Sequence, residues 1–229
     1  MSLSSQVAVR GLSAADVPAS ASLHGQMADI QFIARGGPRL LRPYYRSWMS
    51  TSAALALGAF DDGDGVLVGV LLGCTDPGAH YQEMLRAGGR ATALGMALAA
   101  LTRPAFAREL VTTRALRYTR GLLRRLTGRP RPTTGEGTSR PDQGAAVPGP
   151  RSAEITHLVV DRAHRGSGAG RALVGEAVAR ARQAGCLQVQ LVALPGSGAA
   201  AFYEHLGFRP DGELRSGSGE EFLRFVLDL

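Results

Sequence analysis

The sequence predicts a layered α/β domain, because stretches with the periodicity of strands alternate with stretches that have the periodicity of helices. The alternation is clearest in the last third of the chain. The predicted elements there are a strand at Glu154–Val160, a helix at Gly170–Gln183, a strand at Leu187–Leu194, a helix at Ala199–Leu206 and a strand at Phe222–Leu227.

The first 75 residues follow the same plan with shorter elements. A strand is predicted at Val7–Arg10, a helix at Ala14–Leu23, and a mixture of helix and loop over residues 30–52. Two apolar runs, Ala54–Phe60 and Val66–Cys74, flank a short polar turn that contains two glycines. This pattern predicts an antiparallel hairpin, because glycine supplies the positive φ that a tight hairpin turn needs.

A segment of different composition, residues 78–151, separates these two parts. Helical spacing runs from Gln82 to Leu126 and breaks at Arg103–Pro104, where proline ends one helix and starts another. Residues 111–126 place arginines on one side of a helix and leucines on the other, and residues 127–150 have the Pro, Gly, Ser and Thr content of a mobile loop. We therefore expect all 229 residues to form one domain, with this arginine-rich helical segment as an insert between the third and fourth strands.

Composition excludes several classes of protein. The chain has 229 residues, 45% of them hydrophobic, which is enough to bury a core without disulfides and too many for a disordered protein. Cys74 and Cys186 are too far apart to predict a zinc cluster or a disulfide framework, so a reducing cytoplasm is the expected compartment. The longest apolar stretch, Ala93–Leu101, is about half the length that a bilayer requires, and no export signal is predicted.

The positive charge is concentrated in the insert. All 26 basic residues are arginine, which we attribute to the coding bias of a GC-rich bacterial genome. The range His80–Arg151 has a local net charge of +9, while the rest of the chain has −2. Two interpretations stay open: a solvated helix face, or a segment, Arg114–Arg131, that attracts an acidic partner such as an anionic substrate, nucleic acid or lipid head groups.

The most informative stretch is a strand that runs into a glycine-rich turn and then into a helix, at Val159–Leu173. Backbone N–H groups at such a helix start converge without Cβ atoms in the way, which favours the binding of an anion. A Walker loop needs a lysine, and a dinucleotide fingerprint needs a small residue where Arg171 or Leu173 stands. Both of these phosphate-binding motifs are therefore excluded. A tight turn that binds no ligand remains the alternative to an anion site.

The segment Arg165-x-x-Gly168-x-Gly170 after a strand resembles the acetyl-CoA signature of the GCN5-related N-acetyltransferase (GNAT) family. The later segment Phe202-Tyr203-x-x-x-Gly207-Phe208 is similar to a second motif of that family. The resemblance is strong over residues 153–209 and weaker, in layout alone, over the first 75 residues. It implies a mixed, mostly antiparallel, twisted sheet flanked by helices, and acetyl-CoA as the acyl donor.

The resemblance also implies which backbone groups bind acetyl-CoA. The amides of the glycine turn would bind its pyrophosphate, and the strand before the turn would pair with its pantetheine arm, with the N–H of Val160 against the thioester carbonyl. The implied cofactor-binding residues are Leu158, Val159, Val160, Arg165, Gly166, Ser167, Gly168, Ala169, Gly170 and Arg171.

Three side chains are candidates for proton transfer. Tyr203 matches the family's usual general acid, which we favour over the alternative of a core aromatic residue. Glu154 and His157 lie on the strand beside the expected acetyl group and are candidates for the base, against the alternatives of a solvated carboxylate and a sheet histidine. Gly196 stands where family members often have an asparagine that contacts pantetheine. The remaining histidines show no paired ligand spacing, so no metal site is predicted.

These observations predict an acyltransferase in which a primary amine attacks acetyl-CoA directly, within a ternary complex. Two other functions stay open: an acyl-CoA-binding module without catalysis, and a nucleic-acid-binding protein that acts through the basic insert. The sequence fixes neither the amine, nor the length of the acyl group, nor whether the protein is a monomer or a homodimer.

Overall fold

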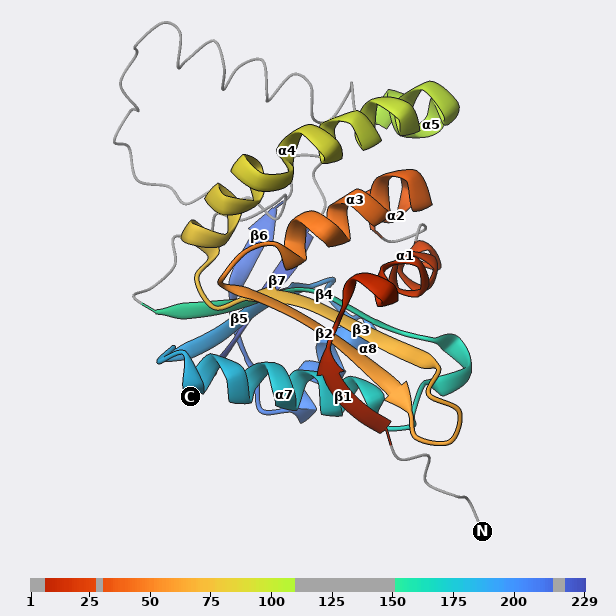
Figure 1. Ribbon diagram of the computed structural model, residues 1–229. Coiled ribbons are helices and arrows are strands. Elements are labelled where there is room, and N and C mark those ends of the chain that lie inside the picture. Colours follow the sequence, from red (N-terminus) through yellow and green to blue (C-terminus); the bar gives the residue numbers. More distant parts are fainter. Residues whose placement is uncertain (1–6, 28–30, 110–150, 216–220) are drawn as a thin grey trace, which may run out of the picture.

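Seven strands form one open sheet with helices on both faces (Figure 1), in a computed structural model that describes residues 7–27, 31–109, 151–215 and 221–229. The strands are β1 (Val7–Gly11), β2 (Ala54–Asp61), β3 (Leu67–Cys74), β4 (Ser152–Val160), β5 (Gln188–Ala193), β6 (Arg209–Arg215) and β7 (Glu221–Asp228). The α-helices are α1 (Val17–Gly25), α2 (Phe32–Arg35), α3 (Pro38–Met49), α4 (Pro77–Thr102), α5 (Pro104–Glu109), α7 (Ala169–Gln183) and α8 (Gly198–His205), and short 3-10 turns, η1 (Ala14–Asp16) and η3 (Arg162–His164), precede α1 and α7.

The strand order across the sheet is β1-β2-β3-β4-β5-β7-β6. Every neighbouring pair is antiparallel except β4 and β5, which are parallel. Parallel neighbours need a long crossover connection, and α7 supplies it. The predicted class, a mixed and mostly antiparallel sheet flanked by helices, is confirmed, and the described helices α4 and α5 lie between β3 and β4.

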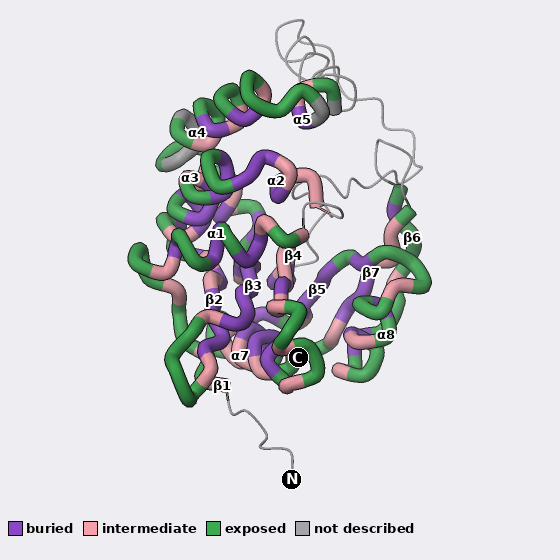
Figure 2. The backbone as a smooth tube through the Cα atoms, turned by 90° about the vertical axis from the view of Figure 1, so that its right-hand side faces the viewer, coloured by how far each residue is buried: buried purple, intermediate pink, exposed green. Residues whose placement is uncertain are grey.

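The sheet separates two hydrophobic cores (Figures 1 and 2). The upper face, covered by α1 and α3 with α4 outside them, buries Trp48 and Leu72, and the lower face, covered by α7 and α8, buries Leu173 and Phe225. Because β3 is buried on both faces, it reads as a continuous apolar run instead of an alternating one.

The helices of the upper face are fixed by polar contacts as well as by packing. The Trp48 indole donates a hydrogen bond to the Gly73 carbonyl oxygen at 2.9 Å, which ties α3 to β3. The helix α4 packs along α3, and it ends at Thr102 so that Pro104 begins α5. The predicted break at Arg103–Pro104 is therefore confirmed.

Some element boundaries differ from the prediction. The helix predicted from Gln82 begins earlier, at Pro77, because Asp76 caps it by accepting the Ala79 N–H at 2.9 Å. The helix predicted from Ala14 begins with the turn η1. The edge strand β6 was not predicted. The predicted basic helix 111–126 and the predicted loop 127–150 lie outside the described residues.

Candidate active site

The glycine turn between β4 and α7 is open and rich in free N–H groups. Gly166 and Gly168 have φ of 83° and 92°, and no atom lies within 4 Å of a Cβ built on either residue. Their backbone N–H groups find no acceptor in the described part of the chain. The first turn of α7 adds the N–H groups of Gly170 and Arg171, which have no partner within the helix, while the Ala169 N–H donates to the Ser167 hydroxyl at 3.4 Å. The turn is therefore shaped to receive an anion.

Side chains hold the turn on both sides. The Asp161 carboxylate accepts hydrogen bonds from the Ala163 N–H at 2.8 Å and from the Gln26 amide at 3.2 Å, and these contacts lower its pKa. The Gln26 contact ties the turn to the end of α1, beside a hollow of about 430 Å³. On the other side, the ring of Phe202 would lie 3.3 Å from a Cβ on Gly170, so α8 packs closely against the helix start.

The strand β4 diverges from β5 just before this turn. The two strands pair only from Ser152 to Ile155, whereas β4 pairs with β3 from Glu154 to Val160, interrupted by one bulge. The predicted pantetheine-binding residues Leu158, Val159 and Val160 therefore have an unpaired edge toward β5. The Asp161 N–H donates to the Val68 carbonyl oxygen on β3 at 2.8 Å. Since N–H groups alternate along a strand, the Val160 N–H points into the gap.

A β-bulge in β4 brings the two predicted base candidates to one face. Leu72 pairs with His157 and Gly73 pairs with Ile155, so Thr156 has no partner on β3. Glu154 pairs with Cys74, which is two residues from Leu72 and therefore shares its face. Both candidates consequently face the helices of the upper face.

Glu154 is a mostly buried carboxylate with one occupied oxygen. Its Oε1 accepts hydrogen bonds from the Tyr81 hydroxyl at 3.2 Å and the Thr156 hydroxyl at 3.1 Å. Its Oε2 has no hydrogen-bond partner among the described residues. Burial raises the pKa of Glu154, and the two hydrogen bonds oppose this shift.

His157 is more deeply enclosed than Glu154. Its Nε2 lies 2.9 Å from the Tyr44 hydroxyl, while its Nδ1 is buried without a partner in the described part of the chain. The rings of His157 and His24 are 4.8 Å apart, and His24 in turn lies 3.1 Å from the Tyr45 hydroxyl. Burial lowers the pKa of His157 well below its usual value, and the neighbouring His24 lowers it further.

Tyr203 lies on α8 in the lower core, 7% exposed, with its ring near those of Phe202, Phe208 and Phe225. Its hydroxyl has no hydrogen-bond partner among the described residues. Burial raises the pKa of Tyr203 to about 12, so the phenol keeps its proton at neutral pH. The α8 ring that lies against Gly170, at the start of α7, is that of Phe202, which belongs to the second sequence motif but for which no role was predicted.

The sequence analysis also missed Tyr81, Thr156 and Tyr44, the partners of the two base candidates. Nothing in the local sequence signals their position, because Tyr81 lies 73 residues before Glu154 and Tyr44 lies 113 residues before His157. The predicted acidic-partner segment Arg114–Arg131 lies outside the described residues.

Within residues 7–27, 31–109, 151–215 and 221–229, no three His, Cys, Asp or Glu side chains gather in a way that could hold a metal ion. None of the helices described there combines the length and hydropathy that a membrane-spanning helix requires.

Comparison with known proteins agrees with this geometry. Residues 134–208 match the model of the acetyltransferase (GNAT) family. No curated protein matches the chain. Many solved structures share its fold, among them the ribosomal-protein-S18-alanine N-acetyltransferase of Escherichia coli, at 14% identity and a TM-score of 0.51, over 97% of this chain and 94% of that one.

Two other structures are similar over nearly the whole chain. A chimera of the spermidine N-acetyltransferase of Vibrio cholerae has 14% identity and a TM-score of 0.55, over 98% of this chain and 96% of that one. A Salmonella typhimurium structure that contains its cofactor acetyl-CoA has 13% identity and a TM-score of 0.54, over 97% of this chain and 94% of that one. The resemblance found in the sequence is thus confirmed: residues 134–208 match the acetyltransferase (GNAT) family, and the chain has the fold of GNAT N-acetyltransferases.

Proposed function

We propose that this chain is an acyltransferase that moves the acetyl group of acetyl-CoA to a primary amine. The observation that carries the proposal is the divergence of β4 from β5 directly before the open glycine turn. The free edge of β4 can pair with the amides of pantetheine as an added strand would. The N–H groups from Gly166 to Arg171, with the positive end of the α7 dipole, can bind the diphosphate.

The reaction then needs three groups from this chain. The neutral amine attacks the acetyl carbonyl carbon, and the N–H of Val160 stabilises the oxyanion that forms. Glu154 takes the proton that the amine nitrogen loses as the new C–N bond forms. The C–S bond breaks, and Tyr203 gives a proton to the leaving thiolate. Glu154 then releases its proton to water and the Tyr203 phenolate takes one up from water, which returns both groups to their starting states.

Glu154 fits the role of the base better than His157 does. The Oε2 atom of Glu154 has no hydrogen-bond partner among the described residues, and the raised pKa of Glu154 makes the carboxylate a stronger base than a solvated glutamate. The Nε2 atom of His157, in contrast, is held by Tyr44, and its other ring nitrogen is enclosed. We therefore assign His157 to the packing of the upper face.

The test is thiol-release kinetics with acetyl-CoA and a panel of small amines, polyamines and peptides. Glu154→Gln should lower kcat with the best acceptor by roughly 100-fold or more, since general base catalysis contributes about that much. Tyr203→Phe should lower kcat while CoA binding, measured by calorimetry, persists. Glu176→Gln is the control, because Glu176 lies on α7 and its carboxylate pairs with Arg180 at 2.8 Å. Absence of thiol release with every amine would refute the proposal.

One observation favours a second function, acyl-CoA binding without catalysis. The recorded ring contacts of Tyr203 are all with phenylalanines, and none is with β4. In that case the calorimetric titration would show CoA binding, whereas thiol release would stay at the uncatalysed rate. The two functions are thus separated by the same pair of measurements.

Two further expectations remain proposals. A cytoplasmic location is consistent with the two buried free thiols, Cys74 and Cys186. Recruitment of an acidic partner by residues 114–131 is tested by comparing acceptor affinity at low and high salt, since binding to phosphates or carboxylates through arginine weakens steeply as salt increases.

A further inference from the structure

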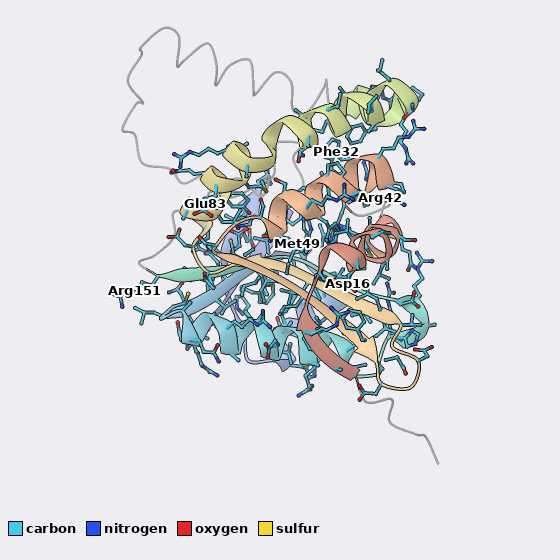
Figure 3. All side chains as sticks on the ribbon, in the orientation of Figure 1. Asp16, Phe32, Arg42, Met49, Glu83 and Arg151 are labelled. Atoms are coloured by element: carbon cyan, nitrogen blue, oxygen red, sulfur yellow. The ribbon has the colours of Figure 1, made fainter. Side chains whose placement is uncertain are left out.

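The first turns of α4 are fixed firmly against the upper face. Asp76 caps the helix, and the His80 ring is fully buried 4.4 Å from the Trp48 ring, with its Nδ1 2.5 Å from the Thr51 hydroxyl. The Glu83 carboxylate, labelled in Figure 3, accepts the Ser52 N–H at 2.9 Å. These contacts anchor α4 to α3 and to the residues that precede β2.

This anchoring places Tyr81 above β4. Its hydroxyl donates to Oε1 of Glu154 at 3.2 Å, and its ring lies 6.1 Å from that of Trp48. The hydroxyl of Thr156, at the bulge, donates to the same oxygen at 3.1 Å. One carboxylate oxygen is therefore held by two donors, while Oε2 has no partner in the described part of the chain.

Tyr81 comes from a part of the chain that the family match does not include. The match covers residues 134–208, and α4 belongs to the segment between β3 and β4 that resembled no family motif. A side chain of α4 nevertheless contacts the proposed base directly.

We propose that Tyr81 is a positioning residue for acetyl transfer: it holds Oε1 of Glu154 so that Oε2 faces the amine, and α4 thereby forms one wall of the acceptor site. The inference rests on the proposed function. Loss of the Tyr81 hydroxyl would leave a carboxylate that only Thr156 holds, and the carboxylate could then turn away from the acetyl group.

The hydrogen bonds from Thr156 and Tyr81 both favour the charged form of Glu154. The titratable groups that face its carboxyl are the thiol of Cys74 on β3 and the phenols of Tyr44 on α3 and Tyr81 on α4, with His157 farther along β4. None of these carries a positive charge at neutral pH. The hydrogen bonds from Tyr81 and Thr156 are the recorded contacts that lower the pKa of Glu154 against the effect of burial.

The test is the pH dependence of kcat for Tyr81→Phe with saturating acetyl-CoA and the best acceptor of the amine panel. Removing a donor to a carboxylate raises its pKa, so the acidic limb of the profile should move up by roughly one pH unit. Activity at a pH below the limb should fall about tenfold, and much of it should return at high pH. Tyr45→Phe is the matched control, because it removes a buried hydroxyl, 3.1 Å from His24, that does not touch Glu154, and it should shift nothing.

The double variant Tyr81→Phe/Glu154→Gln separates this inference from the proposed function. If Glu154→Gln removes the acidic limb and Tyr81→Phe leaves it in place, Tyr81 does not position the base, while the proposed function stands. If the acidic limb of the pH profile survives in Glu154→Gln, Glu154 is not the base. The proposed role of Glu154 and the proposed role of Tyr81 are then both wrong. If both hold, adding Tyr81→Phe to Glu154→Gln should have no further effect on the profile.

A second variant keeps the test valid if Tyr81→Phe fails to fold. Site-specific 3-fluorotyrosine at position 81 keeps the ring and its packing but makes the phenol a stronger donor. The limb should then move to lower pH, opposite to the shift in Tyr81→Phe. An unchanged limb in the fluorinated protein would overturn the inference.

Discussion

Substitution of Gly168 tests the glycine turn most directly. Gly168 has a φ of 92° and precedes α7, and nothing lies within 4 Å of a Cβ placed on it. Gly168→Ala therefore creates no clash, and its whole cost is conformational, about 1–2 kcal/mol for a left-handed residue with a Cβ. The free protein can relieve this strain by relaxing the turn, but CoA binding requires the turn as it is.

The strain should therefore appear as lost affinity. About 1–2 kcal/mol corresponds to a dissociation constant for CoA that is roughly 5- to 30-fold higher, measured by isothermal titration calorimetry. Gly175→Ala is the control, since Gly175 lies within α7, also has open space around it and has no positive φ. It should bind CoA as the wild type does and be slightly more stable. Equal CoA affinity in Gly168→Ala and Gly175→Ala, with both proteins folded, would refute the assignment of the glycine turn to binding of the CoA diphosphate.

Two other predictions concern stability. Gly73→Ala should lower the melting temperature by about 4–8 °C, because the new Cβ would lie 2.5 Å from the Glu154 backbone oxygen at the bulge, and such overpacking costs roughly 2 kcal/mol. An unchanged melting temperature in calorimetry would mean that the bulge is not tightly packed. Burial lowers the pKa of both His24 and His80 to about 4, so the unfolded chain binds more protons than the folded one between about pH 4 and pH 6.5. Stability should consequently fall as the pH drops through that window, with a smaller fall in His24→Gln, and a melting temperature independent of pH would contradict this account.

The sequence indicated those parts of the fold that depend on local pattern. Strands such as β2 and β3 and the helix α7 follow from periodicity, and the turn at Gly166 and Gly168 follows from the conformational freedom of glycine. The strand β6 was missed because it is an edge strand of mostly exposed polar residues, with Leu214 its only buried member. Its pairing with β7, and not an apolar pattern, makes it a strand.

The candidate site was predicted in its backbone and missed in its side-chain partners. A strand–turn–helix segment brings its own N–H groups together, so local sequence is sufficient to predict it. The bulge at Thr156 depends on the register between β3 and β4, and the contact of Tyr81 with Glu154 depends on how α4 packs on α3. Neither feature is encoded within a short stretch, and without the bulge Glu154 and His157 would lie on opposite faces of the sheet.

Burial on this shared face affects the two candidate bases in opposite ways. A low dielectric disfavours charge, so it raises the pKa of a carboxyl group and lowers that of an imidazole. The buried carboxylate of Glu154 therefore binds a proton more tightly than it would in water, whereas the buried ring of His157 binds one less tightly. A base that must take a proton from an amine gains from the first change and loses from the second. The same helices that enclose the upper face thus strengthen Glu154 as a base and weaken His157.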